Sequence, residues 1–154
     1  MEGSNWESES DFRRDEPKII ENILWLEANP IASTANNTKD ITAYVIDWLS
    51  NCPYVTVLYD EMFLENLAYN KKYKFSEKFR VTYLLGKSYY ILLNPDDSNE
   101  VKASARGIEG MVKVYRELKK IDPDVKHRLL EKYSRMEKKG KIEAYTESML
   151  NKPL

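Results

Sequence analysis

The amino-acid sequence predicts an all-α protein of six or seven amphipathic helices, arranged as an up-down bundle or as stacked helical hairpins. Apolar residues recur at helical spacing through most of the 154 residues. Prolines and Asn or Asp caps separate these stretches by short loops. Only residues 54–58 have the composition of a β-strand, and a lone short strand has no partner here. We therefore expect this run to be an extended connector.

Each expected helix is marked by an apolar stripe and by a start or stop signal. The helices cover about residues 17–29, 40–51, 60–68, 77–93, 100–119, 123–139 and 142–149. The helix over 77–93 is apolar on most sides, which predicts a central position. Gly86 in its middle lowers helix stability, so we expect it to let a neighbouring helix approach closely. The helix over 100–119 carries the clearest one-sided stripe, from Val101 to Leu118.

Composition divides the chain into two parts. Residues 1–15 are rich in Ser and Glu and predict a flexible N-terminal arm. Residues 16–150 predict a single helical domain, with Pro17 in the first turn of its first helix. The first two helices end alike, since Trp25 and Trp48 are each followed by a leucine and then by a helix-ending proline. This pattern favours two antiparallel helices that place both tryptophans in a shared core.

The charge balance and hydropathy exclude several classes of protein. The chain has 24 Lys and Arg against 25 Asp and Glu, a net charge of -1. A nucleic-acid binder usually carries a basic excess, so we expect no nucleic-acid partner. That expectation would change if the lysines of residues 71–78 joined those near 119–128 on one face. No apolar run is long enough to predict a membrane span.

The sequence contains no recognised catalytic or metal-binding motif. Cys52 and His127 are its only cysteine and histidine, which removes intramolecular disulfides, the usual zinc sites and His-based triads. We expect Cys52 to be buried and structural, His127 to face solvent, and no cofactor or metal to be bound. The alternative is an enzyme that uses carboxylates and tyrosines, with Asp47 or Glu109 in a pocket between helices.

Aromatic residues are the most unusual feature of the composition, with 11 tyrosines and three tryptophans. Most fall on the apolar stripes and are explained by core packing. The candidate binding residues are the four that fit the stripes least well: Tyr69, Tyr73, Tyr89 and Tyr90. Exposed aromatics can bind peptides or small ligands. We therefore expect a non-enzymatic helical module that binds a protein partner or a small ligand, its oligomeric state being open.

Several segments carry a family resemblance: Trp25-Leu-Glu-Ala-Asn-Pro30, Ala43-Tyr-Val-Ile-Asp-Trp48, Cys52-Pro-Tyr-Val-Thr-Val57, Leu92-Leu-Asn-Pro-Asp-Asp97, Lys102-Ala-Ser-Ala-Arg-Gly-Ile-Glu109, Val112-Lys-Val-Tyr115 and Lys139-Gly-Lys-Ile-Glu143. Together they resemble an uncharacterised family of small all-helical proteins from Bacteroidetes, a domain of unknown function. The resemblance implies a protein that is usually exported to the cell envelope. The sequence as given has no signal peptide, so a periplasmic location is expected only if the N-terminus was trimmed. The family has no established site residues.

Overall fold

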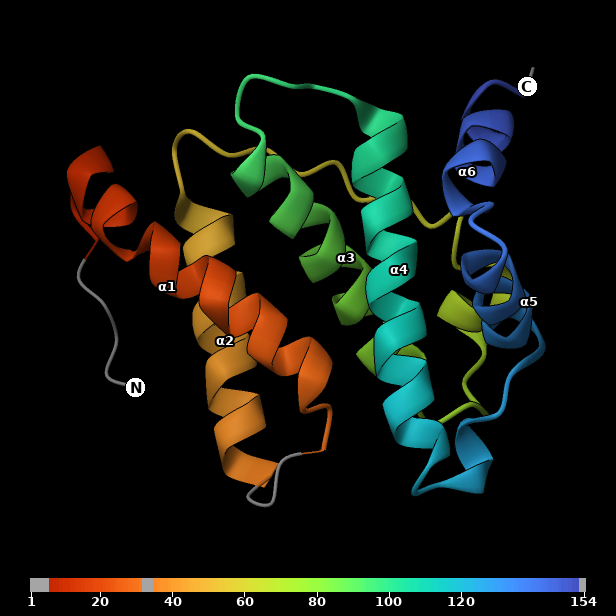
Figure 1. The fold of residues 1–154 in the computed structure, drawn as a ribbon. Coiled ribbons are helices and arrows are strands. Elements are labelled where there is room, and N and C mark those ends of the chain that lie inside the picture. The colour runs from red at the N-terminus through yellow and green to blue at the C-terminus, as the bar shows by residue number, and fades with distance from the viewer. Residues whose placement is uncertain (1–5, 32–34, 153–154) are drawn as a thin grey trace. The chain divides into compact units, whose positions relative to one another are not determined.

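The computed structural model describes residues 6–31 and 35–152, which form only helices and loops, without a strand (Figure 1). The predicted all-α fold class is confirmed. The helices are α1 (Glu9–Ala28), α2 (Ala35–Asn51), the 3-10 helix η1 (Glu65–Tyr69), α3 (Ser76–Leu93), α4 (Glu100–Lys119), the 3-10 helix η2 (Pro123–Val125), α5 (Arg128–Lys138) and α6 (Ile142–Leu150). The chain divides into two compact units, residues 1–56 and 57–154, and the single domain predicted over 16–150 stays a prediction.

In the first unit, α1 starts earlier than the sequence predicts. The carboxylate of Asp11 accepts the backbone N–H groups of Glu7 at 2.8 Å and Ser8 at 3.1 Å. This arrangement satisfies donors that a helix start leaves open, so the helix begins at Glu9. Residues 9–15 are therefore helical and do not belong to a flexible arm, and Pro17 lies inside the helix. Residues 1–5 of the predicted arm lie outside the described residues.

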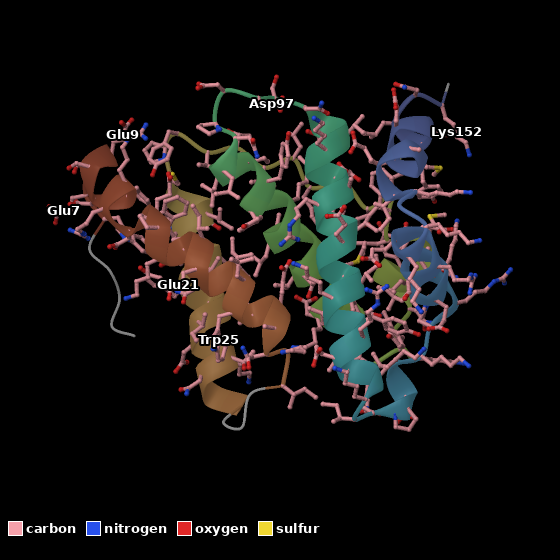
Figure 2. The ribbon with its side chains drawn as sticks, viewed as in Figure 1. Glu7, Glu9, Glu21, Trp25, Asp97 and Lys152 are labelled. Atoms are coloured by element: carbon pink, nitrogen blue, oxygen red, sulfur yellow. The ribbon has the colours of Figure 1, made fainter. Side chains whose placement is uncertain are left out.

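The core of the first unit forms where α1 packs against α2. Trp48 is fully buried, and its indole N–H donates to the backbone carbonyl of Phe12 at 3.2 Å. Trp25, labelled in Figure 2, is only half-buried, so the two tryptophans do not share the core equally. Cys52 follows α2 and is buried, and this burial raises the pKa of its thiol. The prediction of a buried cysteine is confirmed.

The second unit is organised around α4, which packs against α3, α5 and α6. The apolar stripe of α4 is buried from Ala105 to Leu118, while Val101 at its start is half-buried. Within this unit α3 packs against α4 and η1. In this unit α4 therefore has more helical neighbours than α3. The sequence predicts the central position for residues 77–93, which form α3.

Two glycines bring α3 and α4 together. A Cβ atom on Gly86 would lie 3.0 Å from the backbone oxygen of Arg106 and 3.0 Å from the Cα of Gly107. A Cβ on Gly107 would lie 2.8 Å from the ring and the backbone oxygen of Tyr83. A side chain at Gly107 would overlap its neighbours, and one at Gly86 would force the backbone of α4 to move by a few tenths of an ångström. The close approach of a helix at Gly86 is therefore confirmed.

The segment before α3 differs from the predicted helix over 60–68. It consists of a connector without regular secondary structure over residues 55–61, a turn at 62–64 and η1, so the β-prone run forms no strand, and its first residue, Tyr54, lies in a turn. Asp60, the first residue of the predicted helix, instead faces the buried ammonium of Lys87 at 3.4 Å. That ammonium also donates to the backbone carbonyl of Leu58 at 2.6 Å and to the carboxylate of Glu100. These tertiary contacts hold the connector against α3 and α4 and override the local preference for helix.

Candidate functional site

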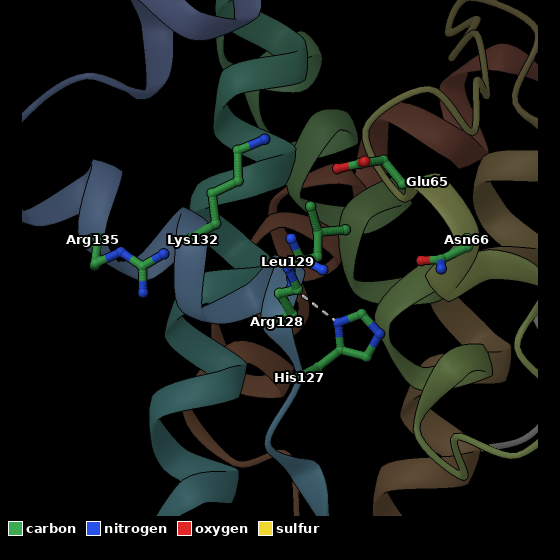
Figure 3. A pocket seen from close by; sticks show the side chains of 7 residues that line it. All are labelled: Glu65, Asn66, His127, Arg128, Leu129, Lys132 and Arg135. Carbon is green, nitrogen blue, oxygen red and sulfur yellow. Dashed lines mark hydrogen bonds between the residues drawn. The ribbon is translucent and has the colours of Figure 1, made fainter.

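A groove of about 740 Å³ lies between η1 and the first turns of α5 in the second unit (Figure 3). Its volume falls within the range of small-ligand pockets, roughly 300–1,000 Å³. The residues that line it come from these two elements and the residue before α5: Glu65, Asn66, His127, Arg128, Leu129, Lys132 and Arg135.

His127 lines the groove and caps the N-terminus of α5. Its Nδ1 accepts the backbone N–H of Leu129 at 3.1 Å, and its own backbone N–H donates to the hydroxyl of Tyr115 at 3.3 Å. Its ring centroid lies 4.8 Å from that of Tyr73. Because Nδ1 is an acceptor, the neutral ring carries its proton on Nε2. His127 is half-buried and held in place, which corrects the prediction of a solvent-facing histidine.

The position of His127 makes the stability of the fold depend on pH. Burial lowers the pKa of His127 below its ordinary value of 6.5, and the charge of Glu65 opposes this effect. As the pH falls below 6.5 the unfolded chain takes up a proton before the folded chain does. The contribution of neutral His127 to the stability of the fold is therefore complete above pH 6.5. It is lost as the pH falls toward the lower pKa of His127 in the folded state.

We expect the melting temperature of the wild type to fall more between about pH 7 and about pH 5.5 than that of a His127→Asn variant. Asparagine keeps a capping acceptor but does not titrate in this range. Thermal melts followed by circular dichroism at a series of pH values measure the difference, because carboxylate titration affects both proteins alike. Parallel pH profiles for the two proteins would contradict the prediction.

Three cationic side chains share the groove face of α5. Arg128, Lys132 and Arg135 follow one another at i, i+4 and i+7, which places them on one side of the helix. The ammonium of Lys132 lies 4.8 Å from the ring centroid of Tyr145. Across residues 6–31 and 35–152, nothing forms an ion pair or hydrogen bond with the guanidinium groups of Arg128 and Arg135. Both arginines line the groove, where an anion can reach them.

The opposite wall of the groove is formed by η1, which contributes the carboxylate of Glu65 and the side-chain amide of Asn66. Figure 3 shows the carboxylate of Glu65 and the ammonium of Lys132 directed toward one another across the groove, and no ion pair joins the two. Glu65 has a φ of 47°, in the left-handed region that side-chain-bearing residues seldom adopt. Backbone strain of this kind is concentrated at functional sites and ligand clamps. The groove therefore combines a cationic wall with a strained acidic one.

Two of the four predicted tyrosines lie near the N-terminal end of α3. Tyr69 closes η1 and is 72% exposed. Tyr73 is half-buried, its hydroxyl donates to the backbone carbonyl of Val125, and its ring stacks on that of Phe79. Burial raises the pKa of Tyr73 well above its ordinary range. Tyr73 is thus a supporting residue of the groove through its contact with His127.

The other two predicted tyrosines lie near the C-terminal end of α3. The hydroxyl of Tyr90 donates to the carboxylate of Asp97 at 2.7 Å. Asp97, labelled in Figure 2, lies in the loop between α3 and α4. The guanidinium of Arg106 lies 4.6 Å from the ring centroid of Tyr89. Because the two pairs occupy opposite ends of an 18-residue helix, the structure does not bring the four tyrosines together.

A second cavity, of about 350 Å³, lies between α4, α5 and α6 and contains Glu109. Burial raises the pKa of Glu109, with a further contribution from Glu137, while Arg106 and Lys113 act in the opposite direction. Glu137 itself is paired with Arg116 at 2.5 Å. This cavity is the counterpart of the predicted carboxylate pocket. Asp47, the other residue suggested for it, is exposed on the first unit.

The described residues also bear on metals, membranes and nucleic acids. Among them, no three or more His, Cys, Asp or Glu side chains are grouped so as to hold a metal ion. No helix in this part of the chain has both the length and the apolar character needed to cross a membrane. The two lysine-bearing segments considered for nucleic acid do meet, but through an ion pair of 2.9 Å between Lys74 and Asp122. The acid neutralises part of the positive charge there.

Comparison with known proteins identifies no relative of this chain. No protein-family model matches it, no curated protein matches it, and no solved structure matches it. The resemblance to the Bacteroidetes family remains a prediction. Any function must therefore be argued from the site itself.

The groove was not predicted from the sequence, although one of its signals is visible there. The i, i+4, i+7 spacing of Arg128, Lys132 and Arg135 is a regular cationic row on one helix face. The acidic wall at Glu65 gives no such signal, because it lies more than 60 residues away in the chain and in a segment expected to be α-helical.

Proposed function

We propose that this chain is a non-enzymatic binding module that holds an anionic ligand in the groove between η1 and α5. The observation that carries the proposal is the row formed by Arg128, Lys132 and Arg135 along a groove of about 740 Å³. Two of these cations, the arginines, have no anionic partner among the described residues. A guanidinium presents a fork of donors that matches carboxylate and phosphate oxygens.

The surrounding structure supports an anion at this place. The groove opens at the N-terminus of α5, where the helix dipole is positive. Tyr73, Tyr115 and the capping bond from Leu129 hold His127 in one orientation, so its Nε2 is presented by a fixed ring. Preorganised groups lose little freedom on binding, which favours affinity. Of the four tyrosines predicted from the sequence, Tyr73 supports the site through its ring contact with His127.

Binding is tested by titrating inorganic pyrophosphate into isotope-labelled protein and following backbone amide chemical shifts. We expect the shifts to change around residues 127–135, and the affinity to fall by about tenfold or more in an Arg128→Glu, Arg135→Glu variant. The affinity should also fall as salt is added, because the site is exposed and screened. An Arg128→Ala, Arg135→Ala variant repeats the test without introducing new charges.

The matched control is Lys138→Glu, which reverses a charge of the same helix outside the groove. Its affinity for pyrophosphate should stay within about twofold of the wild type, because an exposed charge away from the ligand is screened. Equal losses in the control and the groove variants would indicate only a general effect of net charge. If neither pyrophosphate nor a polycarboxylate such as citrate changed the amide chemical shifts near α5, the proposal would be refuted.

A second candidate function is an enzyme with Glu109 as its acid or base. The observation that favours it is a carboxyl whose pKa is raised by burial in a cavity. The cations Arg106 and Lys113 oppose the raised pKa of Glu109, and the residues that line the cavity include no hydroxyl or thiol side chain, so the groove is the stronger site. A carbon-detected NMR titration that gives Glu109 an ordinary pKa would remove this candidate.

A further inference from the structure

We infer that the ligand of the groove is a peptide segment in extended conformation with acidic residues at alternate positions. The inference rests on the proposed function and specifies its ligand. It combines the charge of both walls of the groove with the spacing of the cations on α5.

The wall formed by η1 distinguishes a peptide from a polyphosphate. Glu65 and Asn66 line this wall, facing the cations of α5 (Figure 3). A carboxylate can accept hydrogen bonds from the backbone N–H groups of a peptide, and an amide can both accept and donate. The oxygens of a fully ionised polyphosphate have no donor to offer, and their charge is repelled by Glu65. A ligand that fits both walls carries anions on one side and N–H donors on the other.

The spacing along α5 matches an extended chain. With a rise of about 1.5 Å per residue, Arg128 and Lys132 are separated by about 6 Å along the helix axis, and Arg128 and Arg135 by about 10 Å. Side chains on one face of an extended peptide recur about every 6.6 Å. Two alternate acidic residues therefore reach Arg128 and Lys132 together, and Arg135 lies within reach of the next. The groove volume accommodates a segment of a few residues.

Glu65 is also held where such a ligand requires it. Its backbone N–H donates to the carbonyl of Glu61 at 3.2 Å, while its φ of 47° turns the chain away from a regular helix. Its exposed carboxylate lines the groove and makes no ion pair or hydrogen bond in the described part of the chain. Glu65 thus keeps a strained backbone although its side chain forms no hydrogen bond or ion pair that would stabilise the fold. A role in ligand binding explains this strain.

The test uses a fluorescein-labelled peptide of sequence Gly-Glu-Ser-Glu-Ser-Glu-Gly, the same peptide with Gln for Glu, and inorganic triphosphate as an unlabelled competitor. Fluorescence polarisation should show binding of the acidic peptide and a loss of about tenfold or more with the Gln peptide. Glu65→Gln should weaken peptide binding by about tenfold, because a charged acceptor is replaced by a neutral one. The same variant should strengthen triphosphate binding by removing a repulsive charge.

The matched control is Glu61→Gln, which removes a carboxylate from the same segment outside the groove and should leave both affinities unchanged. If triphosphate binds at the groove but the peptide does not, or if Glu65→Gln strengthens both ligands, the peptide inference is overturned and the proposed anion site stands. If neither ligand shifts the amides of residues 127–135, the proposed function itself fails.

Discussion

Removing both carboxylates that face Lys87 is expected to destabilise the protein by about 3 kcal/mol or more, whereas replacing Lys87 with Met should cost about 1 kcal/mol or less. The Lys87 side chain is completely buried, while those of Asp60 and Glu100 are 32% and 42% exposed. An Asp60→Asn, Glu100→Gln variant leaves a buried cation without a counter-charge. Lys87→Met instead leaves two carboxylates that water can reach, and an apolar chain fills the space of the lysine stem.

Urea unfolding followed by circular dichroism gives the free energy of unfolding for each variant. The matched control is Glu117→Gln, which removes the acid of an exposed ion pair with Lys120 at 3.0 Å near the end of α4. This control should change stability by less than about 0.5 kcal/mol. If Lys87→Met proved more destabilising than the double variant, packing of the lysine stem would outweigh its charge balance, contrary to the expectation.

The contacts of Lys87 also predict which segment of the second unit loosens first in the double variant. Lys87 donates to the carbonyl of Leu58, and Asp60 lies two residues further along the connector. Losing the charge balance should therefore loosen the segment between Val57 and α3 before it affects the rest of the unit. Hydrogen exchange of the amides of residues 57–64 in the double variant would detect this local loosening.

The long helices of the second unit follow from the sequence because their apolar period extends over several turns. The stripe from Val101 to Leu118 predicts α4 nearly to its observed ends, and in the structure the side chain of Asn99 caps its start. Gly86 is informative for a physical reason as well. A glycine inside a helix is tolerated when a neighbouring backbone occupies the place of its side chain, which is what α4 does.

Composition misleads where one specific side-chain contact determines the local structure. Asp60 has the sequence context of a helix cap, yet its carboxylate faces Lys87, which lies 27 residues away. The polar composition of residues 9–15 indicates an arm, but Asp11 organises a helix start at Ser8. In each case the deciding interaction involves a side chain whose partner is not recognisable from composition.

The candidate site is less predictable than the fold because it is assembled from two remote segments. Tyr69, Tyr73, Tyr89 and Tyr90 are predicted from their poor fit to the apolar stripes. This criterion considers one helix at a time and not the elements that pack beside it, and of the four only Tyr69 is exposed. Tyr73 contacts the groove because the loop before α3 brings its ring against His127.

Substituting Ala for Gly107 is expected to destabilise the protein by about 2 kcal/mol, although alanine is the better helix former. The helix propensity of Ala favours the variant by about 1 kcal/mol. Against this, the new Cβ would lie 2.8 Å from two ring carbons of Tyr83 and 2.8 Å from its backbone oxygen. A rotation of the ring does not move the backbone oxygen, so α3 and α4 must separate. Overpacking of this kind costs about 1–3 kcal/mol and more when backbone shifts are needed, which exceeds the propensity gain.

Gly140→Ala is the matched control, because the residue change is the same and the surroundings differ. Gly140 has a φ of 65°, and no atom lies within 4 Å of the position that a Cβ would take, so its substitution costs about 1 kcal/mol through backbone strain alone. Amide chemical shifts should change along α3 and α4 in Gly107→Ala, but only near the α5–α6 turn in Gly140→Ala. A Gly107→Ala protein as stable as the wild type would mean that the two helices lie further apart than 2.8 Å contacts allow. A larger loss of stability in Gly107→Ala than in Gly140→Ala would instead support close packing where α3 and α4 meet at Gly107.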